Sequence, residues 1–495
     1  MQQHSDEPRV RGVIAPQSFQ AGMATVECEP PIGVDLVGFL RRHQPTQAHG
    51  RHPLEVSALV ADDGHRRVAV VALDLGLVVG SYALHLREII ARAAGCSPDR
   101  VLVNCQHTHS APPPPGLIKM GGLSRDLSPQ EQQYWENLVL AAGKAASLAA
   151  SRLGPARMGT GSSLLDNVSV NRRERIATGE VILGYSPSGP CDRAVSVLRF
   201  ELDDRVATVV NFACHPTVLG PDTLEASSDY VGPLRTAVRE WTGGECMFLQ
   251  GCAGNVVPLN SVWDVPGYEI TVGRAVALEA LRASAQAHPA PRRLDRTEYR
   301  SAVPMARYRW VDDGEFESNV DSAEQEIELR LENLPSIDEV RALRADLQKQ
   351  VAQLRSSGAG PEKWNSIDLH ALWAKQIEEQ IANGSVKRAL RRRVQVIRIN
   401  QAAIVGLPGE PFNEIGTVIK NSSRAPFTMV CGYTNEALGY VPTSDEYPFG
   451  GYEVSLSHRH YGYAAPLARG ADHVLQDTAR NLLDRLFPAK AGAIA

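Results

Sequence analysis

The sequence lacks the features that mark membrane and secreted proteins. Its most apolar run, residues 68–80, is interrupted by Asp74 and is too short to span a bilayer. The first residues, MQQHSDEPRVRGVIAPQ, contain neither the charged nor the apolar region of a signal peptide. The eight cysteines include no C-x-x-C pair, which favours reduced thiols. These absences predict a cytoplasmic protein without integral membrane association, although a processed secreted chain would look similar.

The sequence also has little net charge. Its 51 basic and 56 acidic residues leave a formal charge of −5, so nothing indicates a nucleic-acid partner. The basic run KRALRRRV, residues 387–394, is the exception, and we interpret it as a solvated helix face. A length of 495 residues predicts one large domain or two unequal ones.

Short β-rich runs alternate with amphipathic helical stretches along most of the chain. A strand, a helix and a second strand are predicted in turn by VAVVALDLG, HLREIIARAAG and RVLVNCQ. A hairpin around Asp203 and Asp204 is predicted by VSVLRFEL and RVATVVNFACH. This alternation predicts an α/β fold with a mixed central sheet flanked by helices. The last helix should turn these residues inward: Val474, Leu475, Ala479, Leu482, Leu483 and Leu486.

Residues 310–390 break this rhythm. Ser336 and Glu339 have capping-box spacing at the start of one long helical pattern, and Trp373, Ile377 and Ile381 form a stripe on a second. We therefore expect an inserted helical hairpin, which serves either for packing or as a lid, and we favour the covering role. The predicted division is a tail at 1–20, a core domain at 21–309 and 391–490, and the hairpin at 310–390.

The stretch VNCQHTHSAPPPPG places two histidines near a strand end. An extended segment points residues i and i+2 to the same side, so His107 and His109 should face together. The following prolines cannot donate to a sheet ladder and must leave the sheet. This pattern is compatible with a metal site, but also with a merely polar strand end.

Four predicted strands end near a side chain that suits metal binding or acid–base chemistry. These residues are His107, His215, Glu410 and Tyr440. In open α/β sheets, ligand sites form outside the carboxyl ends of strands. Two histidines and a carboxylate form many hydrolytic zinc sites. A purely structural role is also possible. The Glu410 carboxylate could stabilise the N-terminus of the following helix through the helix dipole, and His215 could simply be the polar residue that ends a strand.

Six segments carry a family resemblance: QHTHSAPPP, VNFACHPTV, SSDYVG, GCAGNVVP, LPGEPF and TNEALGYVPTSDEYPFGGYE. In this order they resemble the catalytic domain of the neutral/alkaline non-lysosomal ceramidases, zinc amidases that cleave the N-acyl bond of ceramide. The resemblance runs from about Ala21 to the C-terminus without residues 310–390, as in a short bacterial-type member.

The resemblance implies a role for each matching residue. It makes one catalytic Zn²⁺ the cofactor, bound by His107, His215, Glu410 and Tyr440. His109 and Tyr452 would hold the carbonyl oxygen as it becomes an oxyanion, and Arg172 would anchor the substrate. Asp229 would lie behind the ligands.

The sequence also departs from the family pattern. Val257 stands where the family has a serine, so this loop matches in structure and not in function. Only 43 residues follow Tyr452, so we expect this sequence to lack the β-sandwich domain that ceramidases carry. The metal chemistry is therefore better supported than the ceramide substrate.

The predicted function is a zinc-dependent amidohydrolase that cleaves the C–N bond of an N-acylated small molecule or lipid. A metal-bound water would attack, and Glu410 or a neighbour would move the proton. The alternatives are an ester or lactone hydrolase and a zinc-binding protein without turnover. Cys105, Cys214 and Cys252 lie near the predicted site, and we expect them to be buried apolar residues rather than nucleophiles.

Overall fold

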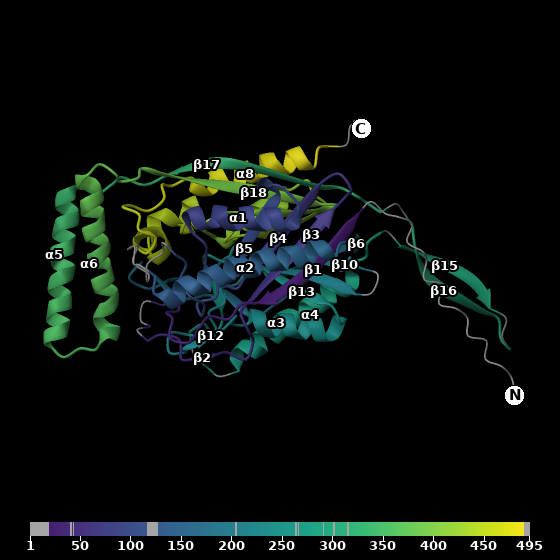
Figure 1. Cartoon of the computed structure of the whole chain (residues 1–495), viewed down its shortest axis with the longest axis horizontal. Helices are drawn as coiled ribbons and strands as arrows, with labels where there is room; N and C mark the ends of the chain where they lie inside the picture. Colours follow the sequence, from purple (N-terminus) through teal and green to yellow (C-terminus); the bar gives the residue numbers. More distant parts are fainter. Residues whose placement is uncertain are drawn as a thin grey trace.

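Three mixed sheets surround a common core in this computed structural model, with helices on their outer faces (Figure 1). The structure describes residues 19–39, 42, 44–115, 127–202, 205–262, 265, 267–290, 292–299, 302–313 and 316–489. The predicted tail lies almost wholly outside this part, as do Asp203 and Asp204. The predicted α/β class is confirmed, but the strands form separate sheets rather than one central sheet.

The first sheet has the strand order β5-β4-β3-β1-β6. Its strands are β1 (Gln20–Glu27), β3 (Glu55–Asp62), β4 (Arg67–Leu73), β5 (Val101–Cys105) and the short β6 (Gly154–Pro155). Helices α1 (Gly80–Ala94) and α2 (Pro129–Ser151) bury alanine and leucine side chains against its outer face. A capping box of Ser128 and Glu131 begins α2, because it satisfies backbone N–H groups that the first turn leaves free.

The second sheet has the order β13-β11-β10-β7. Its strands are β7 (Arg157–Leu164), β10 (Ala194–Glu201), β11 (Val206–Phe212) and β13 (Glu245–Gln250). The predicted hairpin is confirmed, since β10 and β11 pair antiparallel. Helices α3 (Val231–Thr242) and α4 (Tyr268–Gln286) cover the outer face.

The third sheet has the order β17-β18-β19-β21. Its strands are β17 (Val320–Arg330), β18 (Ala389–Ile399), β19 (Ala402–Gly406) and β21 (Phe427–Cys431), with α7 (Asn413–Ser422) and α8 (Ala471–Leu486) outside. Two expectations were wrong here. The basic run, expected on a helix, lies mostly in β18, where Arg391 and Arg393 face glutamates of β17. Val474, expected to point inward, is 38% exposed because it lies off the buried stripe of α8.

The inner faces of the three sheets meet in one apolar core. Met23 and Leu59 from the first sheet pack with Phe200 from the second and with Ile397 and Met429 from the third. Each sheet contains one parallel pair, namely β4–β5, β11–β13 and β19–β21. Isolated bridges join the ends of these strands between sheets, at Asn104–Thr434 and Gly251–Cys431. The carboxyl ends of β5, β11 and β19 therefore converge.

Shorter strands surround this point of convergence. They are β8 (Ser169–Arg175), β9 (Val181–Ser186) and β14 (Val256–Pro258) in one sheet, the parallel pair β20 (Glu410–Pro411) and β22 (Tyr440–Val441), and the pair β2 (Ala48–His49) and β12 (Glu225–Ala226).

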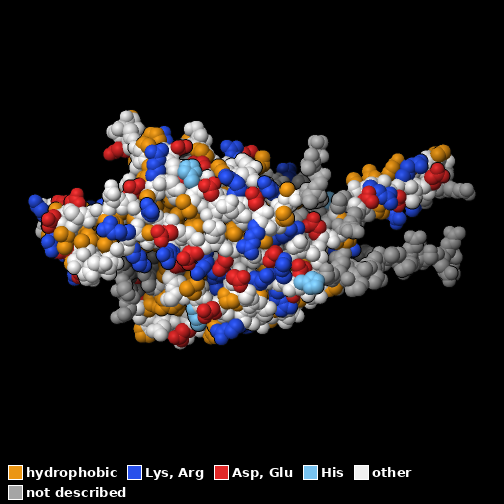
Figure 2. All heavy atoms as spheres, turned by 90° about the horizontal axis from the view of Figure 1, so that it is seen from above, with side chains coloured by type: hydrophobic (Ala, Val, Ile, Leu, Met, Phe, Trp, Pro, Cys, Tyr) orange, Lys and Arg blue, Asp and Glu red, His pale blue; other side chains and the backbone are white. Residues whose placement is uncertain are grey.

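Two hairpins extend from opposite ends of the molecule (Figure 1). Helices α5 (Ile337–Ser356) and α6 (Pro361–Ala382) form the predicted helical hairpin, with the capping box of Ser336 and Glu339. It is shorter than 310–390, because the flanking residues pair as β17 and β18. Strands β15 (Arg292–Tyr299) and β16 (Met305–Asp312) form an arm that the sequence did not predict, and Figure 2 shows its basic and hydrophobic side chains in solvent. Among the described residues, no helix is long and apolar enough to cross a membrane.

Candidate metal and active site

Three converging strand ends bring two histidines and a carboxylate together. His107 follows β5, His215 follows β11, and Glu410 lies just beyond β19. Oε2 of Glu410 lies 3.2 Å from Nε2 of His107 and 3.3 Å from Nε2 of His215. All three side chains are buried.

Backbone carbonyls determine which imidazole nitrogens carry hydrogen. Nδ1 of His107 lies 2.5 Å from the carbonyl oxygen of Gly76, and Nδ1 of His215 lies 2.6 Å from that of Ala253. A carbonyl oxygen only accepts, so each Nδ1 must donate, and the Nε2 lone pairs point toward Glu410. Among the described residues, neither Oε2 of Glu410 nor Nε2 of His215 has a hydrogen-bond partner.

When both rings are neutral, three electron-pair donors meet without a hydrogen between them. Burial and the Arg172 guanidinium lower the pKa of His215 to about 4, so its ring is neutral near pH 7. Burial raises the pKa of Glu410, and only positive charge at the facing His107 and His215 nitrogens holds that pKa well below its usual range. Neutral imidazoles and an ionised carboxylate are the forms that bind a metal ion, so these residues fit a cation.

His109 joins the same cluster, by a route that differs from the expected one. Strand β5 ends at Cys105, and His107 has a left-handed φ of 72°. The two rings meet because the chain turns here, not because it is extended. Nε2 of His109 lies 3.4 Å from Nε2 of His107. The ligand atoms of His107, His109 and His215 lie within 4.8 Å of one another, so His109 is also positioned to bind a metal.

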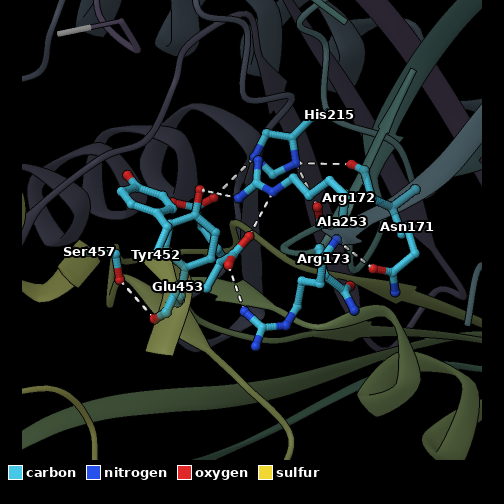
Figure 3. Close-up of polar contacts among 12 residues, drawn as sticks. Asn171, Arg172, Arg173, His215, Ala253, Tyr452, Glu453 and Ser457 are labelled. Carbon is cyan, nitrogen blue, oxygen red and sulfur yellow. Dashed lines mark hydrogen bonds and ion pairs between the residues drawn. The ribbon is translucent and has the colours of Figure 1, made fainter. Parts of the chain in front are cut away.

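Tyr440 is placed beside Glu410 by the pairing of β20 with β22. Burial raises the pKa of Tyr440 well above its ordinary value, and the neighbouring Arg172 opposes this effect. Arg172 donates from Nη2 to the Tyr440 hydroxyl at 3.0 Å and from Nε to Glu453 at 2.8 Å. Glu453 also accepts from Arg173 at 2.8 Å (Figure 3). The predicted anchor Arg172 is thus itself held in place by a buried ionic network.

Tyr452 begins the short helical turn Tyr452–Leu456, which also carries Glu453. Its ring lies edge-on to Tyr440 with centroids 5.6 Å apart, and its hydroxyl lies 3.0 Å from Nδ1 of His460. The sequence analysis missed His460 and Tyr461. The Tyr461 hydroxyl donates to Oε1 of Glu410, so both oxygens of that carboxylate face fixed groups. The signal available in the sequence was SHRHYGY, residues 457–463, which groups histidines and tyrosines.

The loop containing Val257 contacts His215 and the chain next to Glu410. Besides the Ala253 carbonyl that receives His215, the backbone N–H of Gly254 donates to the carbonyl of Pro411, directly after Glu410. A Cβ at Gly254 would lie 2.4 Å from the Glu410 carbonyl oxygen, so only glycine permits this approach. Asp229, which the resemblance placed behind the ligands, accepts from the backbone N–H groups of Leu219 at 2.9 Å and Tyr230 at 2.7 Å.

Two cavities meet at this cluster. A small one of about 50 Å³ is lined by His107, His109, Glu410, Tyr440 and Tyr452, among others. A larger one of about 580 Å³ shares His109, Tyr440 and Tyr452 with it. The wall of the larger cavity is mainly apolar and includes Val170, Leu183, Val257, Leu259 and Val262.

The helical hairpin lines neither cavity, so the expected lid role is not seen. Instead the hairpin packs against the segment that follows Tyr452, where Trp373 and Ile377 bury against Ala464.

The cysteines near the site are buried, which disfavours the thiolate form. All eight cysteines are unpaired, as expected from their spacing. Burial raises the pKa of the Cys105, Cys214 and Cys252 thiols, which keeps them protonated. Their predicted role as small buried apolar residues is confirmed.

Comparison with solved structures identifies the fold. No protein-family model and no curated protein sequence matches the chain. The neutral ceramidase of Pseudomonas aeruginosa is similar in structure, with a TM-score of 0.62 and 18% identity over 96% of this chain and 76% of that one. A ceramidase complexed with C2 gives a TM-score of 0.64 and 18% identity, over 96% and 77%. The predicted resemblance is confirmed for the fold: over nearly its whole length, this chain has the fold of neutral ceramidase.

Proposed function

We propose that the protein is a zinc-dependent hydrolase that cleaves the amide bond of an N-acylated, lipid-like compound. The observation that carries this proposal is the convergence of His107, His215 and Glu410. Oε2 of Glu410 lies 3.2 Å from Nε2 of His107 and 3.3 Å from Nε2 of His215. Each Nδ1 donates to a backbone carbonyl, so in the neutral rings no hydrogen lies between Nε2 and the carboxylate. Such a buried arrangement is unfavourable unless a cation shares the electron pairs.

The donor set favours zinc. Two imidazoles and a carboxylate match the three protein ligands of catalytic zinc sites, and oxygen-preferring ions such as Mg²⁺ use fewer nitrogens. We assign Tyr440 as the further ligand, because the Arg172 guanidinium 3.0 Å away would stabilise its phenolate form. His109 could compete for this place. We assign it to the substrate instead, as the resemblance to the ceramidases implies for the second histidine of the H-x-H pair.

The chain's own residues would orient the acyl group. A bound zinc ion supplies a water of lowered pKa and polarises the acyl carbonyl. His109 and Tyr452 border both cavities, so a substrate that spans the two passes between them. Donors aimed at a developing oxyanion contribute about 3 kcal/mol each in other enzymes. Glu410, or a neighbour, would move the proton toward the departing amine.

The substrate class follows from the larger cavity. Its mainly apolar wall suits an acyl chain, and the structural neighbours are ceramidases. Ceramide itself is one candidate among N-acyl amides.

A turnover assay by mass spectrometry on N-acyl amides, ceramides and carboxylic esters, with and without chelator, tests this function. Chelator-sensitive release of amine is the expected result. Release from esters alone would replace the amidase by an esterase. Zinc-loaded protein that cleaves no member of a panel covering short and long acyl chains would indicate a binding protein.

Val257 offers a test of the acyl-chain cavity. Replacing it with serine, the residue that the ceramidase pattern has here, removes apolar contact from the cavity wall. We expect KM for long-chain amides to rise about fourfold, because one lost methylene contact is worth about 0.8 kcal/mol, and KM for acetyl amides to stay unchanged. Steady-state kinetics on both chain lengths measure this. An equal change for both substrates would place the acyl chain elsewhere.

A further inference from the structure

A chain of polar contacts joins the helical hairpin to the proposed catalytic tyrosine. Nε2 of His370, in the middle of α6, lies 3.2 Å from Nε2 of His460. The ring centroids lie 5.3 Å apart and the ring planes are inclined by 21°, so the two nitrogens meet edge to edge. Nδ1 of His460 lies 3.0 Å from the hydroxyl of Tyr452, which borders both cavities.

The position of His370 depends on how the hairpin docks. Trp373 lies one turn further along α6 and donates from Nε1 to the carbonyl of Tyr463 at 3.0 Å. Val340 of α5 and Ile377 of α6 pack with Ala464 in the same apolar cluster. The hairpin is therefore held against the segment that carries His460, although none of its residues reaches the cavities.

The three groups must share hydrogens in one of two directions. Burial lowers the pKa of His370 to about 4 and that of His460 to about 3, so each neutral ring carries one hydrogen. In one direction Tyr452 donates to His460 and His460 donates to His370. In the other direction His370 donates to His460, His460 donates to Tyr452, and the tyrosine hydrogen remains free.

A carbonyl oxygen in the cavity distinguishes the two directions. If Tyr452 donated to His460, its oxygen lone pairs would face those of the carbonyl, which is repulsive. If His460 donates to Tyr452, the tyrosine hydrogen can point at the carbonyl, and every contact has one donor and one acceptor. Only the second direction allows Tyr452 to stabilise an oxyanion.

We propose that His370 and His460 are positioning residues, which set the direction of the Tyr452 hydroxyl. Nε2–H of His370 donates to Nε2 of His460, and Nδ1–H of His460 donates to the oxygen of Tyr452, so the tyrosine hydrogen is directed to the substrate carbonyl. This inference rests on the proposed role of Tyr452 in amide hydrolysis. It assigns the inserted hairpin a part in the site: the hairpin positions a donor from behind instead of covering the cavity.

Nitrogen-15 NMR of the histidine rings tests the proposal without turnover. The zinc-loaded full chain is labelled at its imidazoles, with octanoate present as a carboxylate acceptor in the cavity. We expect His370 to carry hydrogen on Nε2 and His460 on Nδ1. In H370F, which keeps a ring but loses the donor, His460 should shift its hydrogen to Nε2. His460 protonated on Nε2 in the wild type, or a tautomer unaffected by H370F, would overturn the proposal.

Kinetics on the preferred amide provide the second readout. H370F should lower kcat about 10- to 100-fold with little change in KM, because a misdirected group near the reacting atoms costs rate rather than binding. H370Q retains an N–H donor and should recover most of the rate. Equal losses in H370F and H370Q would contradict a role for the donated hydrogen.

W373F is the matched control for hairpin packing. It removes the indole donor to Tyr463 and leaves the His370 contact in place, so kcat should stay unchanged. A loss in W373F equal to that in H370F would assign the effect to docking alone. If the NMR showed the expected tautomers but the protein cleaved no amide, the proposed function would be overturned, while the direction of the hydrogen bonds would stand.

Discussion

Replacing His215 with alanine is expected to abolish both metal binding and hydrolysis. His215 is fully buried, and its Nε2 faces the Glu410 carboxylate at 3.3 Å. Without it, the site offers one imidazole fewer to hold zinc, and the water that depends on the metal loses its activation. We expect turnover to fall by about 10³-fold or more, in line with the contribution of a catalytic metal. Zinc content by elemental mass spectrometry and amine release measure the two effects.

His473 provides the control that separates the loss of a proposed metal ligand from the loss of any histidine. His473 is exposed on α8 and far in sequence from every proposed ligand. H473A should keep its zinc and its activity. Thermal unfolding of H215A shows whether the variant folds. A folded H215A protein that retains stoichiometric zinc and full turnover would exclude His215 as a ligand.

Replacing Glu453 with alanine is expected to cause the largest loss of stability. Its carboxylate is wholly buried and pairs with Arg172 and Arg173, each at 2.8 Å. Removing it leaves two buried guanidinium groups without the carboxylate that neutralises their charge. Breaking a buried ion pair in this way costs about 3–5 kcal/mol of unfolding free energy. Activity should fall as well, because Arg172 also holds the hydroxyl of Tyr440.

Glu446 is the matched control. It pairs with Arg173 at 2.8 Å and with Arg175 at 2.9 Å, but its side chain is partly exposed. E446A should cost less than E453A, about 1 kcal/mol, as partly solvated pairs do. Urea unfolding of both variants gives the comparison. If E453A lost no more stability than E446A, the network around Arg172 would not be the rigid support that the contacts indicate.

The sequence predicted that three proposed ligands would come together, because of where they lie on the strands. His107, His215 and Glu410 each follow a strand, and polar residues at the carboxyl ends of parallel strands meet in space. This reasoning needs no knowledge of how the sheets are arranged. It therefore succeeded although three sheets, and not one, supply the strands.

The residues that support the proposed ligands could not be found in this way. Tyr461 reaches Glu410 from 51 positions away, and His370 reaches His460 from 90 positions away. Both contacts depend on irregular turns and on the docking of the hairpin, which no periodicity encodes. The β15–β16 arm was missed for a related reason. Its charged and apolar residues are mixed without a regular alternation, and Leu294, Met305, Tyr308 and Trp310 are exposed, so the pattern predicts no buried face.

The segments that were misread show how context overrides local pattern. The basic run around Arg391 predicted a helix face, but β17 offers a row of glutamates, and cross-strand ion pairs fix it as a strand. The H-x-H pair was expected in an extended segment, but the left-handed turn at His107 brings the rings together.

Titration of zinc into chelator-stripped protein, with amine release from an N-acyl amide as the readout, tests the central claim most directly. The account predicts that the stripped protein is inactive and that activity returns in proportion to added zinc. The endpoint should lie at one zinc ion per chain, since His107, His215 and Glu410 form a single site. Full activity in the stripped, zinc-free protein would contradict the claim, as would stoichiometric zinc binding that restores no hydrolysis.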